Sequence, residues 1–292
     1  TLPSLNLNFE LSDNDQLRFA AAKVMGRPPV YQLRGGAGSW IDTANDGGSP
    51  RYNVWAKCNP NLDPFRANQL DLSYEHYFDD GGAATVAFFY KDIESLIETI
   101  TYQEGDIAWS EIGIEAPAGT VEGQYQTVRN NDMGGYIRGL EFAYTKTFDQ
   151  LPGVFGGLGL TATYSFTESE TAVNGGGNFP DLVLPLPGLS ENVWSTTVFW
   201  DIGNFSTNMN VRYRDEYVYA GATPGGSILT MADEYTVIDM QASYAFDNGF
   251  NILAQVNNLT NEANVADYGS AAAVSEYSEF GRQFFIGFSY SY

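Results

Sequence analysis

The sequence predicts an all-β protein, an antiparallel β-barrel that spans a membrane. Residues 282–292 alternate aromatic or aliphatic side chains with small or polar ones, a two-residue period that gives a strand one face for lipid and one for water. The same period recurs upstream in segments as long as a bilayer-spanning strand. The connections between these segments are alternately short and long, which is typical of the two rims of such a barrel.

The period is clear from the first segment onward, where Leu5, Leu7 and Phe9 alternate with polar residues ahead of a turn at 13–15. Later pairs of segments surround other turn sequences, such as Asp-Asp-Gly-Gly at 79–82 and Asp-Asn-Gly at 247–249. The alternation predicts about eleven strands. They are expected at about 5–12, 16–24, 70–78, 86–101, 140–148, 158–166, 194–200, 205–214, 238–244, 250–256 and 282–292.

The polar residues of these strands should share the face that lines the lumen. In the segment 205–214, Met209 and Val211 point to lipid if Asn208 and Asn210 point inward. The residues expected on the luminal face are Glu10, Asp71, Glu75, Glu141, Asn208, Asn210, Arg212, Arg214 and Gln241.

We interpret residues 1–292 as part of one barrel domain. The short connections are expected to be periplasmic turns, which also places the carboxyl terminus in the periplasm. The long connections are expected to be extracellular loops, at about 25–65, 102–133, 172–189, 218–233 and 260–279. Single-chain bacterial barrels have an even number of strands, and an open sheet edge in lipid would leave backbone groups without partners. We therefore expect further strands outside this chain.

The composition excludes several classes of function. The net charge is −22, from 36 Asp and Glu against 14 Lys and Arg, and argues against a nucleic-acid partner. One histidine, His76, and one cysteine, Cys58, cannot build a familiar catalytic triad or a structural zinc site, and no phosphate-binding or dinucleotide motif is present. We therefore expect no enzymatic activity, and we expect the start at Thr1 to mean that the natural amino end is missing or removed.

Several short motifs resemble the carboxyl-terminal half of the barrel of TonB-dependent outer-membrane receptors. In order, they are Leu-Pro-Ser-Leu-Asn-Leu at 2–7, Asn-Pro-Asn-Leu-Asp-Pro at 59–64, Ala-Asn-Gln-Leu-Asp at 67–71, Phe-Tyr-Lys-Asp-Ile at 89–93, Ile-Arg-Gly-Leu-Glu at 137–141, Pro-Leu-Pro-Gly-Leu-Ser at 185–190, Val-Asn-Asn-Leu-Thr-Asn-Glu at 256–262 and the final strand after Gly-Arg at 281–282. Their order and spacing resemble the family along essentially the whole chain.

The resemblance implies a barrel of about 22 strands, of which this chain supplies half, with the plug domain, the energy-coupling box and the first strands outside it. It also implies location in the outer membrane, contact with lipopolysaccharide and coupling to the TonB-ExbB-ExbD complex. The first two motifs are most similar to a proteobacterial branch of the family in which several members take up carbohydrates.

The candidate solute-binding residues are aromatic and polar side chains near the outer rim. Aromatic faces can stack on sugar rings, and nearby carboxylates and amides can accept hydrogen bonds from hydroxyl groups. The same aromatics could instead form the interfacial girdle or pack the loops together. The candidates are Trp40, Trp55, Trp109, Asp106, Glu111, Tyr217, Tyr219, Arg212 and Arg214.

The connection at 102–133 is strongly acidic, with six carboxylates against the single Arg129. Such a field would repel an anionic chelate and favours a neutral or cationic solute. It could equally be a solvated face, or bind Ca²⁺ or another divalent cation that bridges to lipopolysaccharide. The sequence therefore leads us to expect an uptake receptor for a carbohydrate. The alternatives are a receptor for a siderophore, metal complex or vitamin, and a structural barrel that anchors a surface lipoprotein or an S-layer.

Overall fold

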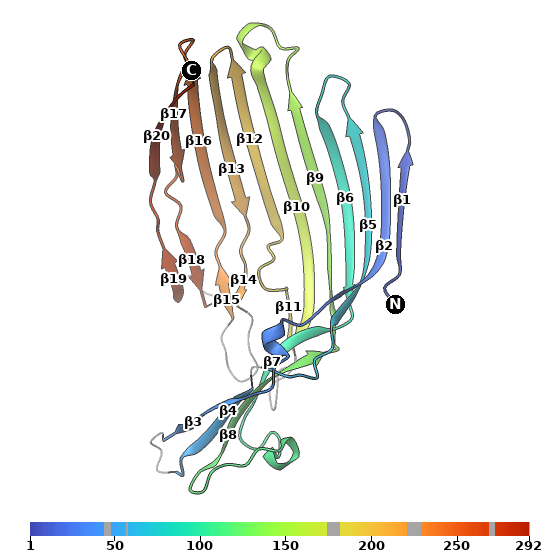
Figure 1. Ribbon diagram of the computed structural model, residues 1–292, viewed down its shortest axis with the longest axis vertical. Helices are drawn as coiled ribbons and strands as arrows, with labels where there is room; N and C mark the ends of the chain where they lie inside the picture. The colour runs from blue at the N-terminus through green and yellow to red at the C-terminus, as the bar shows by residue number, and fades with distance from the viewer. Residues whose placement is uncertain (44–47, 57, 174–181, 221–228, 269–271, 292) are drawn as a thin grey trace.

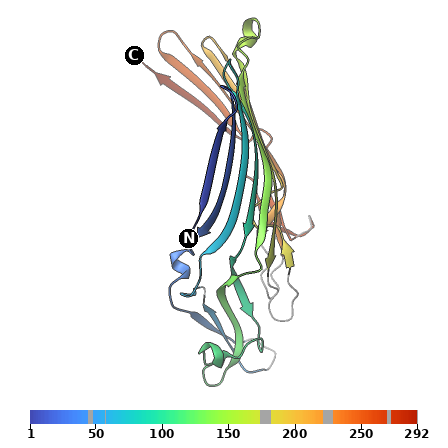
Figure 2. The same cartoon turned by 90° about the vertical axis from the view of Figure 1, so that its right-hand side faces the viewer.

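The computed structural model describes residues 1–43, 48–56, 58–173, 182–220, 229–268 and 272–291. In this part of the chain, eleven strands follow one another in sequence order across a single curved sheet, the main sheet, and each neighbouring pair is antiparallel (Figures 1 and 2). A short further strand, β11 (Leu182–Leu184), pairs with the end of β10. The main sheet consists of β1 (Ser4–Glu10), β2 (Asp15–Gly26), β5 (Phe65–Tyr77), β6 (Ala83–Ile93), β9 (Gly135–Thr147), β10 (Leu158–Val173), β12 (Asn192–Ile202), β13 (Phe205–Arg214), β16 (Tyr235–Ala245), β17 (Phe250–Asn257) and β20 (Gln283–Tyr290).

The two rims of the main sheet differ as the sequence predicts. All the short connections lie at one rim, where the chain also ends, and the long connections lie at the other (Figure 1). The tightest turn joins β12 to β13, where Ile202 pairs with Phe205 and Gly203 has a φ of 56°. Glycine is the residue that adopts this left-handed conformation without strain, so the sequence Gly-Asn determines the turn.

The apolar face of the main sheet is exposed. Met209 stands opposite Val198 and Met240 on the neighbouring strands, yet 39% of its surface is accessible. Leu72 and Phe142 are similarly exposed. A water-soluble protein rarely leaves so large an apolar surface open, whereas a bilayer requires it.

The opposite face is polar, and all the residues predicted to line the lumen lie on it. Within the main sheet the pairing runs without a register shift, so the two-residue alternation keeps its phase from strand to strand. Glu10 and Glu75 both stand opposite Gln16 on β2, on either side of it. At the other end of the sheet, Asn208 stands opposite Gln241.

A polar belt ends the apolar face near the rim of long connections. Lys23 and Asp92 stand on either side of Asn68 on this outward face, and Arg138 stands opposite Glu168. The Arg138 Nη2 atom lies 2.8 Å from Glu168 Oε2. Because charged side chains are costly in hydrocarbon, this belt marks where the apolar band of the wall ends.

The belt continues into Glu94, just beyond β6, and makes that position sensitive to pH. Lys23 Nζ donates to Glu94 Oε1 at 2.5 Å and Asn68 Nδ2 donates to the same oxygen at 3.1 Å. The hydrogen bond from Lys23, followed by that from Asn68, lowers the pKa of Glu94 below its ordinary value of 4.5. A depressed folded-state pKa means that the contact stabilises the protein above the unfolded-state pKa and is lost as pH falls through the folded-state pKa.

We predict that hydrogen exchange at residues 94–96 will accelerate when the pH falls from 7 to 3, after correction for the intrinsic rate. A Glu94→Gln variant should show the faster exchange already at pH 7, because it lacks the carboxylate. Equal protection in the variant and the natural protein at pH 7 would contradict this role for Glu94.

The long connections are not simple loops, because they pair with one another in two accessory sheets. The outer accessory sheet has the order β3 (Gly38–Asp42), β4 (Arg51–Ala56), β8 (Val121–Asn131), β7 (Leu96–Tyr102), with β4 and β8 parallel. The rim accessory sheet has the order β14 (Tyr217–Ala220), β15 (Thr230–Ala232), β18 (Asn264–Asp267), β19 (Val274–Ser278). Short 3-10 turns, η1 (Val30–Gln32), η2 (Trp109–Ile112) and η3 (Gly153–Gly157), complete the elements.

Two sequence expectations are corrected here. The strand expected at 86–101 ends at Ile93, and residues 96–102 belong instead to the outer accessory sheet. The connections expected to be loops carry eight strands within the described residues. Strands β4 and β8, which join within the outer accessory sheet, and β15 and β18, which join within the rim accessory sheet, come from different connections, so no local pattern predicts these two pairings. Residues 44–47, 57, 174–181, 221–228 and 269–271 of the predicted loops lie outside the described part.

Most buried apolar residues lie outside the spanning wall; Ile93, at the end of β6, is the exception among the main-sheet strands described. Val54, Ile100 and Val128 in the outer accessory sheet and Trp109 in η2 are almost fully buried. Val218, Ala232 and Ala266 are buried in the rim accessory sheet. The burial pattern is therefore that expected of a wall facing lipid with folded, water-exposed sheets at one rim.

Among the described residues, no helix is long and apolar enough to cross a membrane.

Candidate solute-binding site

The predicted binding residues separate into two groups. Arg214, Tyr217 and Tyr219 come together at the boundary between the main sheet and the rim accessory sheet. Trp40 and Trp55 belong to the outer accessory sheet, and Trp109 belongs to η2, which lies between β7 and β8 in the chain. The two groups therefore have to be considered as separate candidate sites.

The first group lines a pocket of about 290 Å³, called here the rim pocket. Arg214 ends β13 on the polar face, and its guanidinium carbon lies 3.7 Å from the centre of the Tyr217 ring. Tyr235 on β16 stands opposite Arg214. The other lining residues come from the rim accessory sheet and its approach, and those with polar or aromatic side chains are Tyr219, Asp233, Asn264 and Glu276.

Arg214 is held by the segment that carries the Leu-Pro-Gly-Leu-Ser motif. Its Nε donates to Ser190 Oγ at 2.7 Å, and its Nη2 donates to the backbone oxygen of Gly188. Gly188 N donates in turn to the Val218 carbonyl at 2.8 Å. These contacts use some of the hydrogen-bond donors of Arg214 and orient its planar guanidinium group along the Tyr217 ring. The role of Arg214 is therefore to position the wall of the pocket.

Asp215, the residue after Arg214, adds a carboxylate to a neighbouring hollow that Tyr217 also lines. It accepts from Asn192 N at 3.1 Å and from Asn192 Nδ2 at 2.5 Å, and Tyr213 donates to its other oxygen. Burial raises the pKa of Asp215, but the hydrogen bonds from Tyr213 and Asn192 outweigh it and keep the pKa below the ordinary value. Asp215 is therefore ionised at neutral pH and contributes to the acidic character of the rim.

A second acidic contact lies at the far edge of the rim accessory sheet. Glu279 accepts from Asn261 Nδ2 at 2.5 Å and from the Tyr277 hydroxyl at 2.9 Å. These two hydrogen bonds, that from Asn261 being the larger, lower the pKa of Glu279, and the same contact raises the pKa of Tyr277. The carboxylate therefore stays charged and adds to the negative field.

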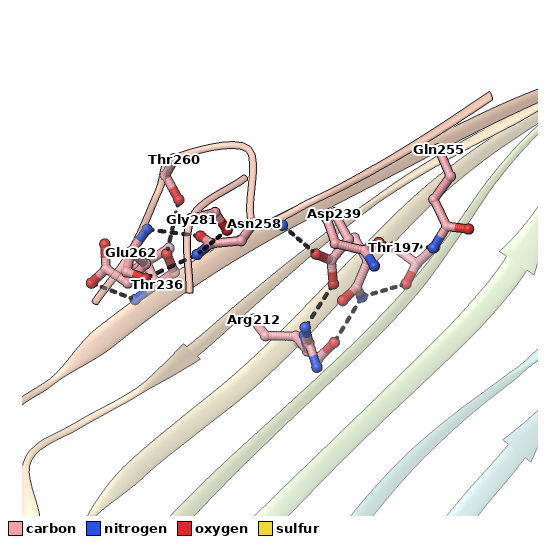
Figure 3. A network of polar contacts seen from close by, with 12 residues as sticks. Thr197, Arg212, Thr236, Asp239, Gln255, Asn258, Thr260, Glu262 and Gly281 are labelled. Atoms are coloured by element: carbon pink, nitrogen blue, oxygen red, sulfur yellow. Dashed lines mark hydrogen bonds and ion pairs between the residues drawn. The ribbon is translucent and has the colours of Figure 1, made fainter. Parts of the chain in front are cut away.

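Arg212, another candidate from the sequence, precedes Arg214 by two residues on β13 and takes part in a different hydrogen-bond network (Figure 3). Its Nη2 donates to Asp239 Oδ2 at 2.6 Å, and Asp239 Oδ1 accepts from Asn258 N at 2.9 Å. The Asn258 side chain then bonds both backbone groups of Glu262, at 2.7 and 2.9 Å. The network connects β13, β16 and the connection after β17. Arg212 therefore has a structural role in this network.

This network explains the Val-Asn-Asn-Leu-Thr-Asn-Glu motif. Asn258 has a φ of 53°, a conformation that asparagine tolerates better than most residues. We predict that Asn258→Ala costs about 1–3 kcal/mol, because two backbone groups of Glu262 lose their partner. Hydrogen exchange at 258–264 in the whole receptor should accelerate, while exchange at the distant β5 and β6 should not change.

Asn258→Gly is the matched control for backbone strain. Glycine tolerates the positive φ but lacks the amide, so it should reproduce most of the effect. Natural protection in both variants would show that the amide bonds do not hold this connection.

The predicted residues of the second group differ in how exposed they are. Trp40 and Trp55 are exposed, at 47% and 41% of their surface, whereas Trp109 is 1% exposed and packs against Tyr52 with ring centres 6.0 Å apart. Trp109 is thus a core residue, and its ring is not available as a binding platform. Asp106 Oδ2 accepts from Gln103 N at 2.7 Å and closes a turn.

Glu111 is exposed in the first turn of η2 and is not among the residues that line the rim pocket. Tyr235, Asn264 and Glu276 were missed by the sequence analysis. They come from three different strands, and only the pairing of the rim accessory sheet with the wall brings them to Arg214. No local pattern marks them.

The described residues include no group of three or more His, Cys, Asp or Glu side chains that could hold a metal ion. Cys58 is half-buried, and its Sγ donates to the Gly36 carbonyl at 3.2 Å.

The curved sheet, its lipid-compatible face and the pocket at one rim define part of a membrane-spanning β-barrel wall. A family model described as TonB dependent receptor-like, beta-barrel matches residues 1–259, and the chain belongs to this family. The family consists of outer-membrane transport receptors rather than enzymes. No curated protein matches the chain significantly.

Solved structures share the fold at low sequence identity. The siderophore receptor PirA from Acinetobacter baumannii is 19% identical, with a TM-score of 0.67 over 100% of this chain and 41% of that one. A variant of the ferric enterobactin receptor PfeA from Pseudomonas aeruginosa is 17% identical, with a TM-score of 0.64 over 100% of this chain and 40% of that one. The copper transporter OprC is 14% identical, with a TM-score of 0.62 over 99% and 39%. The chain thus spans about two fifths of each structure.

Proposed function

We propose that this chain forms part of the wall and outer rim of a receptor that takes up a neutral, hydroxyl-rich solute, a carbohydrate, by TonB-dependent transport. The rim with the long connections then faces the exterior, and the carboxyl terminus faces the periplasm. The TonB-ExbB-ExbD complex would act on parts of the receptor outside this chain. The polar belt would meet the lipopolysaccharide head groups.

The observation that carries the proposal is the composition of the rim pocket. Tyr217, Tyr219 and Tyr235 supply aromatic surface, and Asn264 supplies an amide beside two carboxylates. Sugar rings present apolar C–H faces to aromatic rings and hydroxyl groups to amides and carboxylates. Arg214, the one cation among the described residues that line the pocket, is already bonded to Ser190 and stacked on Tyr217.

Charge supports a neutral solute over an anionic chelate. The chain carries a net charge of −22, and Asp215 and Glu279 at the rim are held in the ionised form. Such a field lowers the local concentration of anions. Siderophore and copper receptors share the fold, so a metal complex or a vitamin is the alternative cargo.

The test is uptake by cells that produce the whole receptor. Radiolabelled maltohexaose, cellohexaose, xylohexaose and laminarihexaose would be compared with ferric enterobactin and copper, in cells with and without TonB. Saturable uptake of a hexasaccharide that requires TonB is expected. Uptake of the iron or copper species alone would favour the alternative cargo. No uptake of any probe would favour a structural barrel that anchors a lipoprotein or S-layer.

A further inference from the structure

One face of the outer accessory sheet carries an organised set of aromatic and amide side chains. Strand pairing places Trp40 opposite Asn53, and the neighbouring pair on the same face is Gly38 opposite Trp55. Trp40 and Asn53 line a pocket of about 390 Å³ together with Gln103 and Gln124, called here the outer platform. In Figure 1 this sheet lies beyond the rim, at the end of the molecule away from the short turns.

The polar side chains of the outer platform are held in place by one another. Gln124 N donates to Asn53 Oδ1 at 2.7 Å, and Gln124 Nε2 donates to Gln103 Oε1 at 3.0 Å. Asn53 is 5% exposed, so the first contact is a buried anchor. Gly123 makes room for it, because a Cβ atom there would lie 2.4 Å from Asn53 Oδ1.

The two indoles complete the face. The Trp55 ring lies across Gly38, where a Cβ atom would be only 1.8 Å from Trp55 Nε1. Since Trp40 and Trp55 are diagonal neighbours on paired strands, their Cα atoms lie roughly 7–8 Å apart. The sheet thus presents two partly exposed aromatic surfaces beside a row of oriented amides.

This combination matches a neutral saccharide better than other ligands. Three charged residues, Asp42, Arg51 and Glu104, also line the pocket. Arg51 Nε lies 3.2 Å from Glu104 Oε2, so the cation among these lining residues is paired and the lining does not favour an anion. Indole surfaces accept the apolar face of a sugar ring, and amides can both donate to and accept from its hydroxyl groups. A lipid or an apolar peptide could contact the indoles, but it would not use the remaining hydrogen-bonding groups of Gln103 and Gln124.

We propose that the outer platform is a glycan-capture site, separate from the rim pocket and independent of energised transport. The ligand class rests on the proposed function. The site would hold one segment of an oligosaccharide at the cell surface, and thereby raise its local concentration at the rim pocket. Binding here involves no covalent chemistry and no movement of the barrel.

The experiment measures binding of fluorescent maltohexaose, cellohexaose, xylohexaose and laminarihexaose to whole-receptor cells that lack TonB. Wild type should bind at least one of them. Trp40→Ala should weaken that binding about tenfold, and Trp40→Phe should restore most of it. Ile41→Ala, which removes an exposed side chain on the other face of the same strand, should bind as wild type does.

Failure of all four probes to bind, undiminished binding by Trp40→Ala, or an equal loss in Ile41→Ala would overturn the inference. A rim-pocket variant, Tyr219→Ala, separates this site from transport. It should reduce uptake in energised cells, and in cells without TonB the binding that remains should still be weakened about tenfold when Trp40→Ala is added. If wild type captures a hexasaccharide but never imports it, the proposed function fails and the outer platform stands.

Discussion

Replacing Trp109 with alanine should unfold the outer accessory sheet while the barrel wall stays intact. Trp109 is 1% exposed and packs against Tyr52 of β4, with the ring centres 6.0 Å apart. Truncating a buried tryptophan costs about 3–5 kcal/mol, and a small four-stranded sheet has little stability to spare. Hydrogen exchange in the whole receptor should therefore become fast in β7 and β8, with protection unchanged in β12 and β13.

Trp40→Ala is the matched control for this prediction. It removes the same side chain from the same accessory sheet, but at a site where 47% of the residue is already exposed. The control should leave protection of β7 and β8 close to wild type. If Trp109→Ala also leaves β7 and β8 protected from hydrogen exchange, Trp109 is not the centre of a core. A role in solute binding would then be the better explanation of this side chain.

The second large effect concerns the two faces of the wall. Met209→Arg places a charge on the apolar face in the middle of β13, between Val198 and Met240. An arginine on the lipid face near the bilayer midplane costs about 2–4 kcal/mol. The whole receptor carrying this change should therefore fold into lipid vesicles with a lower yield, measured by the heat-dependent shift of the folded band on gels.

Asn208→Arg is the control, one residue away on the polar face opposite Gln241. It adds the same charge to the same strand and should fold as wild type does. If Asn208→Arg were the damaging change, the assignment of the two faces would be inverted along the whole main sheet, because the register contains no shift there.

The main sheet could be predicted from sequence because each strand separates two environments. Lipid on one side and water on the other require strict alternation of apolar and polar side chains. The neighbouring residues Asn208 and Met209 show this alternation directly. The short turns add their own signals, as in Gly203. The strand count and the sharing of one face by the luminal residues follow from these local features.

The accessory sheets could not be predicted in the same way. Strand β8 is mostly polar and pairs in parallel with β4, some 70 positions earlier in the chain, so neither composition nor neighbouring turns indicate it. This is also why Trp109 is an exposed candidate in the sequence and a core residue in the structure. Tyr217 and Tyr219 are candidates from their residue type and their place beside a strand end, and they line the rim pocket, whereas Glu276 enters that lining only through the fold.

The two edges of the main sheet show how this chain fits into a larger barrel. Strands β1 and β20 each pair on one side only within the described residues. In lipid, their free backbone groups need partners. The family and the two fifths of each solved structure that the chain covers agree with the expectation that further strands complete the barrel.

The most direct test of the account is a comparison of two ligands that differ only in charge. Cellohexaose and its counterpart oxidised to carboxylates at the C6 positions would be titrated into the purified whole receptor by calorimetry at low salt. The acidic, tyrosine-lined rim predicts that the neutral sugar binds at least about tenfold more tightly. Tighter binding of the carboxylated sugar, or binding of ferric enterobactin in place of both, would contradict it.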